Sequence, residues 1–109
     1  MLETNFRFGE VHKLTSQIND HSDRVQVRHI FSNTNGGATL LGFTAGQKLD
    51  EHLAPAELMV NVLEGEIIFT MNGVPHTIGR GEFMLVGEGV PHSVVANADS
   101  KVLLIKIKA

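Results

Sequence analysis

Two histidines, His52 and His92, are the side chains of this sequence whose type and setting are best suited to chemistry. Imidazole binds divalent metals and acts as a general base near neutral pH. His52 lies in the segment DEHLAPAELMVNVLEGE, residues 50–66, where small and apolar residues follow it instead of further metal ligands. The segment is therefore either a metal-binding strand that lacks part of its site or a core strand with one isolated imidazole.

Short β-strands must position these histidines, because the chain from Val25 onward follows a β pattern. Apolar residues alternate with polar ones in RVQVRHIF (residues 24–31), and the turn formers NTNGG separate this strand from ATLLGFTAG (38–46). KVLLIKIK (101–108) closes the chain as a last strand that alternates lysine with apolar residues near its end. Frequent short strands separated by glycine predict an all-β sandwich or closed barrel.

A hairpin is predicted at Asn72 and Gly73, because this dipeptide is flanked by apolar strands. A two-residue turn there pairs Met71 with Val74 and Phe69 with His76.

The segment before the strands is less regular. Val11, Leu14 and Ile18 stand at roughly helical spacing between threonine and serine, so a short helix and an irregular arm are both open. We predict an N-terminal arm over residues 1–24 and a barrel domain over residues 25–109.

Composition excludes several classes of function. The 109 residues suffice for one buried core, and the net charge of −3 without a lysine or arginine run gives no support for nucleic-acid binding. The chain has no cysteine, which excludes disulfides and thiolate metal sites. The first residues lack the apolar core of a signal peptide, and no apolar run has membrane-spanning length, so we expect no membrane partner and a cytoplasmic location.

The spacing of glycines and histidines resembles the two motifs of the cupin superfamily. Gly46, His52 and Gly65 match the first motif, while Gly81, Gly89 and His92 match the second. Gly87 stands where proline is usual, and Asn97 lies one place beyond the usual asparagine. The resemblance covers roughly residues 38–107 and implies a cupin jelly-roll β-barrel, or double-stranded β-helix, of the small single-domain bacterial type.

The same resemblance implies an incomplete metal site. The family's ligands are three histidines and a glutamate, of which His52 and His92 remain, whereas Ala54 and Leu58 occupy the other two positions. Glu57 is one residue away from the glutamate position, and a strand would turn it to the opposite face unless a bulge intervenes. His76 is the other candidate third ligand, if its apolar face is the barrel interior near the site.

The remaining histidines have simpler interpretations. His29 shares a face with Val25, Val27 and Phe31, which favours a core or interface role, and His12 and His21 are expected on an exposed arm or loop. Apolar residues on both faces of ELMVNVLEG suggest that a second sheet or subunit covers each side, and the resemblance implies a homodimer.

Three functions remain open, and the residue types do not decide whether the protein is catalytic. The first is a small-molecule-binding protein whose apolar barrel pocket contains His52 and His92, with weak or partial metal binding. The second is a metal-dependent enzyme, dioxygenase- or isomerase-like, in which these histidines and a third ligand hold a divalent metal ion. The third is a metal-free enzyme with one imidazole as general base.

Overall fold

Nine β-strands make up most of the computed structural model, which describes residues 1–108. They are β1 (Gln26–Asn33), β2 (Gly36–Phe43), β3 (Lys48–His52), β4 (Glu57–Glu64), β5 (Glu66–Met71), β6 (Val74–Gly79), β7 (Phe83–Val86), β8 (His92–Ala96) and β9 (Ser100–Ile107). Within these residues, no helix has the length and apolar character needed to cross a bilayer.

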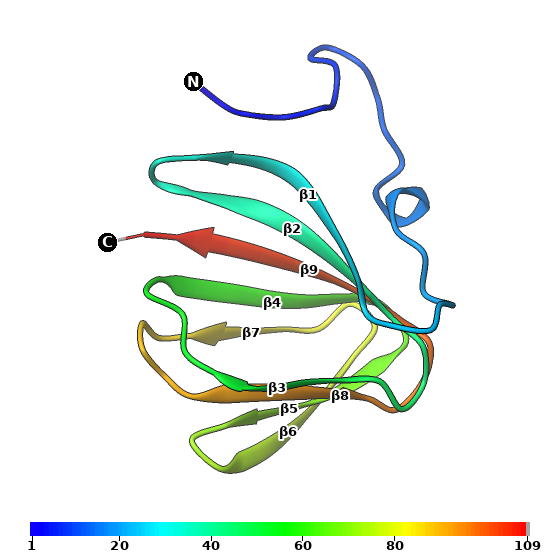
Figure 1. Ribbon diagram of the computed structural model, residues 1–109, viewed down its shortest axis with the longest axis vertical. Helices are drawn as coiled ribbons and strands as arrows, with labels where there is room; N and C mark the ends of the chain where they lie inside the picture. Colours follow the sequence, from blue (N-terminus) through cyan, green and yellow to red (C-terminus); the bar gives the residue numbers. More distant parts are fainter. Residues whose placement is uncertain (109) are drawn as a thin grey trace.

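The strands form two antiparallel sheets that face each other as a jelly-roll barrel, in agreement with the sequence-based prediction (Figure 1). The five-stranded sheet has the order β1-β2-β9-β4-β7, and the four-stranded sheet has the order β3-β8-β5-β6. Apart from the hairpins β1-β2 and β5-β6, neighbours in each sheet come from distant parts of the sequence, and β3 lies beside β8. This pairing places His52 beside His92.

The core lies between the two sheets and is built from alternate residues of each strand. In β4, Leu58, Val60 and Val62 are buried, whereas Met59 and Asn61 on the other face are only partly covered. The same alternation buries Ile67 and Phe69 in β5. Period-two patterning therefore decides which side chains reach the barrel interior.

The hairpin predicted at Asn72 and Gly73 is confirmed. Both residues have positive φ angles, 52° and 77°, as a type I′ turn requires. Met71 pairs with Val74 and Phe69 with His76.

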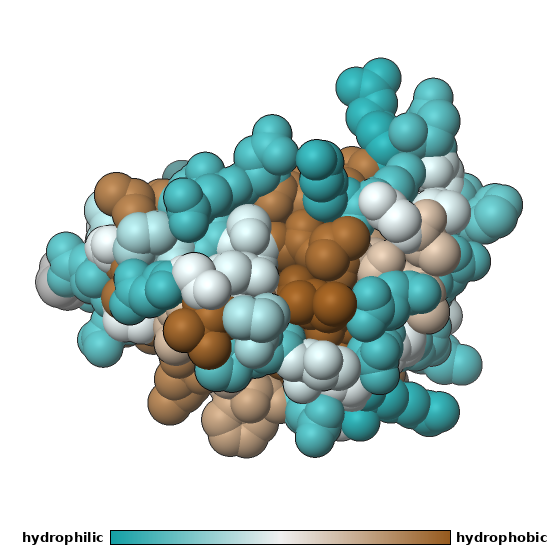
Figure 2. All heavy atoms as spheres, turned by 90° about the horizontal axis from the view of Figure 1, so that it is seen from below, coloured by the Kyte–Doolittle hydropathy of each residue, from teal (hydrophilic) through white to brown (hydrophobic). Residues whose placement is uncertain are grey.

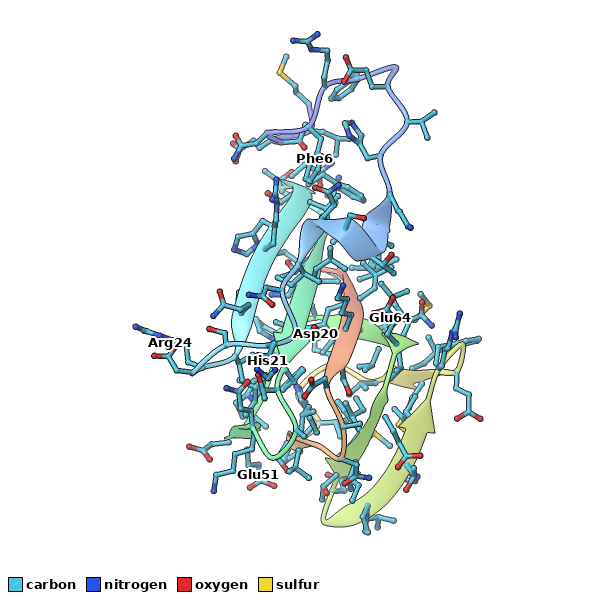
Figure 3. The ribbon with its side chains drawn as sticks, turned by 90° about the vertical axis from the view of Figure 1, so that its right-hand side faces the viewer. Phe6, Asp20, His21, Arg24, Glu51 and Glu64 are labelled. Carbon is cyan, nitrogen blue, oxygen red and sulfur yellow. The ribbon has the colours of Figure 1, made fainter. Side chains whose placement is uncertain are left out.

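The N-terminal segment combines the two predicted alternatives, because a single 3₁₀ turn, η1 (Leu14–Gln17), interrupts an irregular arm. The arm runs along the outside of the five-stranded sheet, where Figure 3 labels Phe6, Asp20 and His21 along its course. The Lys101 ammonium donates to the Thr15 carbonyl at 2.6 Å, and Glu3 forms a β-bridge with Ser32. The arm therefore contacts both the edge and the centre of this sheet. The domain boundary between the arm and the barrel at residue 24 stays a prediction.

Apolar surface remains open on the outside of the barrel. Phe83, Leu85 and Ile107 are exposed by 61%, 68% and 59% on the part of the five-stranded sheet that carries β7 and the end of β9. Figure 2 views the molecule from below, the side on which Figure 1 places β5 and β6, and shows apolar side chains gathered in a patch bordered by hydrophilic ones. One copy of the chain therefore leaves apolar area uncovered. Met59 and Leu63 on the outer face of β4 are partly covered, and a second subunit over this side stays a prediction.

Candidate functional site

The two histidines singled out from the sequence meet at one end of the barrel. His52 ends β3, His92 begins β8, and the two residues are direct partners across the strand pair. Their ring centroids lie 4.3 Å apart with an interplanar angle of 63°. Residues 40 positions apart in the sequence thus form one pair of imidazoles.

A β-bulge in β3 turns His52 toward the barrel interior. Leu49 and His52 are three residues apart, so a regular strand would direct them to opposite faces. The register between β3 and β8 shifts between these two residues, and both line the same cavity. The extra residue of the bulge re-aims the imidazole, as bulges do near many functional sites.

Both imidazoles are held in the same tautomer by the same local contact. Nδ1 of His52 lies 2.9 Å from the Asp50 carbonyl oxygen, and Nδ1 of His92 lies 2.9 Å from the Val90 carbonyl oxygen. Because a carbonyl only accepts, each Nδ1 must donate, which leaves the lone pair of a neutral ring on Nε2.

Neither Nε2 atom has a hydrogen-bond partner among residues 1–108. His92 is only 3% exposed, yet no fully buried side-chain nitrogen in this part of the chain lacks a partner. The Nε2 of His92 therefore borders open space, and the cavity beside it is where a ligand would meet it.

Neighbouring rings fix the position of the buried His92 imidazole. Phe69 stacks on His92 with ring centroids 5.4 Å apart and an interplanar angle of 16°. Met71 is the cross-strand partner of His92 on the side opposite His52. The His92 ring is therefore packed between neighbours and has little freedom to rotate.

The imidazole pair borders a cavity of about 190 Å³ inside the barrel. Its walls are mainly apolar and come from both sheets, with Leu41, Phe43, Val60, Ile67, Val102 and Leu104 among them. The polar side chains among its described lining residues are His52, His92 and Lys106. The geometry suits a small, largely apolar molecule that reaches a few polar groups.

The two positions at which the family pattern carries further ligands also line this cavity. They are Ala54 and Leu58, neither of which has a donor atom. Glu57 is exposed and starts β4 on the outer face, since no register shift occurs next to it. The bulge that would have turned Glu57 inward is absent from the described part of β4, so this candidate third ligand is not in the cavity.

His76 does not complete a metal site either. As the partner of Phe69 it shares the inward-facing side of the hairpin, but it is not among the cavity's lining residues. Within residues 1–108, no group of three or more histidine, cysteine, aspartate or glutamate side chains is placed to hold a metal ion. Zinc and non-haem iron sites use at least three protein ligands, so the residues present do not fit a resident catalytic metal.

The sequence-based interpretation missed Lys106. Of the two roles predicted for His29, the core role is wrong, whereas the interface role stays a prediction. Lys106 lies on the same face of β9 as Val102 and Leu104, an alternation visible in KVLLIKIK that could have identified it. His29 is exposed rather than part of the core, and its Nδ1 lies 3.1 Å from the Thr39 hydroxyl oxygen. The prediction of exposed sites for His12 and His21 is confirmed.

Comparisons with known proteins agree with the fold. The family model described as the cupin domain matches residues 39–107. An RmlC-like cupin protein from Desulfovibrio desulfuricans is 29% identical with a TM-score of 0.79, over 90% of this chain and 95% of that one. No curated protein matches the sequence.

Two further solved structures support the fold alone, because their identities are low. A conserved protein of unknown function from Streptococcus pyogenes is 23% identical with a TM-score of 0.88, over 97% of this chain and 93% of that one. A cupin superfamily protein from Desulfitobacterium hafniense is 17% identical with a TM-score of 0.88, over 97% of each chain.

Proposed function

The chain belongs to the cupin domain family, and we propose that it binds a small, largely apolar molecule in the barrel cavity beside His52 and His92. One observation carries this proposal: two imidazoles with fixed tautomers line a cavity whose other walls are mainly apolar, and neither Nε2 atom has a hydrogen-bond partner among residues 1–108. Preoriented polar atoms in an otherwise apolar cavity are what small-molecule sites use to fix a ligand's orientation.

The cavity volume limits the size of the ligand. A dry apolar cavity of about 150 Å³ in another protein accommodates benzene. The 190 Å³ found here admits a single ring or a short branched chain, with polar substituents that extend toward the mouth. A nucleotide or an oligosaccharide would not fit.

The imidazoles also limit the ligand's chemistry. A neutral ring whose Nδ1 donates to a backbone carbonyl can only accept at Nε2. The complementary group on the ligand is a hydrogen-bond donor, such as a hydroxyl. We therefore expect alcohols and phenols to bind more tightly than ethers of the same size.

A titration observed by NMR tests the proposal. Benzyl alcohol added to methyl-labelled protein should shift the methyl signals of Leu41, Val60 and Leu104, which line the cavity, and leave those of the exposed Leu85 unchanged. The variant Ala54→Phe fills the cavity from its wall and should abolish these shifts.

The matched control is Ala98→Phe, which adds the same ring at an exposed position outside the cavity. This variant should bind benzyl alcohol like the wild type. Shifts spread evenly over the surface, or identical binding by Ala54→Phe and the wild type, would refute binding in the barrel.

The metal-dependent enzyme is the competing function, and it needs a third ligand that residues 1–108 do not bring to the imidazoles. Metal analysis of protein purified without a histidine tag separates the two. We expect well below one metal ion per chain after incubation with zinc, manganese, iron or nickel salts and desalting. A stoichiometric metal content would favour the enzyme.

A metal-free enzyme with an imidazole base ranks third, because no carboxylate orients either ring: the described partners of both Nδ1 atoms are backbone carbonyls. Replacement of His92 by Gln without loss of turnover in a substrate screen would exclude it. The cytoplasmic location expected from the sequence belongs to the same proposal, and cell fractionation tests it.

A further inference from the structure

Lys106 adds a positive charge at the mouth of the proposed binding cavity. It lies on β9 opposite Leu58 of β4, and its side chain lines the cavity although the residue as a whole is exposed. No carboxylate of residues 1–108 forms an ion pair with it. Its ammonium group is thus available to a ligand.

The cavity continues into a groove over the neighbouring strands, and Lys106 stands at the junction. The groove shares Leu58, Leu104 and Lys106 with the cavity and is further lined by His29 and Lys108. Both hollows therefore carry only basic or neutral side chains among their described residues.

The absence of acidic residues from these linings is informative, because the chain has 12 aspartates and glutamates and a net charge of −3. The acidic residues nearest in sequence to the site turn away from it. Asp50 and Glu51 line a separate hollow next to β3, and Glu57 lies in a shallow depression on the outer face of the five-stranded sheet. The negative charge of the protein is thus kept out of the two linings that Lys106 joins.

We propose that the ligand is a small apolar carboxylic acid that also carries a hydroxyl group, such as a hydroxybenzoate. The carboxylate accepts from the Lys106 ammonium at the mouth, the ring fills the apolar cavity, and the hydroxyl donates to Nε2 of His52 or His92. This inference rests on the proposed function, which it narrows from any small apolar molecule to an anionic one.

Isothermal titration calorimetry with a matched pair of probes tests the carboxylate. The pair is 4-hydroxybenzoate and 4-hydroxybenzamide, which have nearly the same shape but differ in charge. Wild-type protein should prefer the acid by about two- to five-fold, because an exposed charge pair contributes at most about 1 kcal/mol. The preference should shrink as salt is raised.

Lys106→Met should remove this preference while leaving the affinity for the amide within about two-fold, because the side-chain stem that packs at the mouth is kept. Lys48→Met is the matched control, since Lys48 lines the separate hollow next to β3. This variant should keep the full preference for the acid.

The outcomes distinguish the two levels of the proposal. Equal binding of acid and amide by the wild type, or a preference that survives Lys106→Met, would refute the carboxylate and leave the cavity proposal standing. If neither probe binds and benzyl alcohol leaves the cavity methyls unshifted, the proposed function itself is wrong.

Discussion

The incomplete coordination shell predicts that two substitutions will convert this barrel into a metal protein. Ala54 and Leu58 line the cavity that His52 and His92 border, so Ala54→His and Leu58→Glu together would supply the two missing donors. The combined set of three imidazoles and one carboxylate is sufficient for a divalent transition metal.

The magnitude follows from the burial of Leu58, which is 7% exposed. Loss of a buried leucine side chain costs about 2–5 kcal/mol, so we expect the metal-free double variant to be about 3 kcal/mol less stable than the wild type. For a domain of this size that lowers Tm by about 12 °C or more. A metal at 1,000 times its Kd should raise the free energy of unfolding of the double variant by about 4 kcal/mol.

The wild type should respond much less to the same metal. Two imidazoles form a weak site, and a Kd equal to the metal concentration stabilises the fold by only about 0.4 kcal/mol. Melting curves from far-UV circular dichroism, with EDTA or with excess zinc or manganese, measure the contrast, since the chain has no tryptophan or tyrosine for fluorescence.

The control is Ala54→Ser with Leu58→Gln, which makes the same cavity positions polar without an imidazole or carboxylate. It should be destabilised like the double variant but should not be rescued by metal. A wild-type Tm that rises with metal as steeply as that of Ala54→His with Leu58→Glu would refute the reasoning, because further ligands would then be present.

Three other predictions concern the surface of the barrel. The homodimer expected from the sequence would cover the exposed apolar side chains around Leu85, so Leu85→Glu should yield a monomer in light scattering after gel filtration. The backbone N–H of Ala45, which donates to Asp99 at 2.9 Å, holds the pKa of Asp99 below its usual value of 3.8, with a smaller contribution from His21. A carboxyl whose pKa is lowered on folding stabilises the folded state above pH 3.8. The wild type should therefore have a larger free energy of unfolding than Asp99→Asn near neutral pH. This difference should vanish as the pH falls through the pKa of Asp99 in the folded protein. A Cβ on Gly42 would collide with the Asn19 carbonyl of the arm, so Gly42→Ala should cost about 1–3 kcal/mol in urea unfolding and expose the arm to trypsin.

Each of these predictions has a matched comparison. For the dimer, the control is Val11→Glu, which places the same charge at a fully exposed apolar residue of the arm and should leave the oligomeric state unchanged. A wild-type protein that is itself monomeric would contradict the prediction. A wild-type advantage over Asp99→Asn that grows in acid would reverse the predicted sign. For Gly42→Ala, the control is Gly87→Ala, where a Cβ would meet Val90 at an ordinary 3.4 Å and should be tolerated. Equal stability of Gly42→Ala and Gly87→Ala would exclude the contact between Gly42 and the arm.

Local patterns in the sequence were sufficient for much of the fold. The Asn72-Gly73 dipeptide determined the register of its hairpin. The strand β4 is apolar on both faces, so its sequence did not show that Leu58, Val60 and Val62 form the buried one. The pairing of His52 with His92 required the family resemblance, because the strand order of a jelly roll is not written in any single strand.

Other features depend on long-range geometry that no local pattern contains. The bulge that brings Leu49 and His52 to one face follows from the pairing of β3 with β8. His29 was assigned a core or interface role from its apolar neighbours, but the four-stranded sheet leaves that part of β1 open, which excludes the core role.

The electron density beside His52 and His92 tests the central claim most directly, in crystals of protein purified without a histidine tag and soaked with 4-hydroxybenzoate. We predict planar organic density in the cavity, with its hydroxyl at hydrogen-bond distance from an Nε2 atom and its carboxylate at Lys106. A single compact peak about 2.0–2.1 Å from both Nε2 atoms, completed by other ligands, would be a metal ion and would contradict the account.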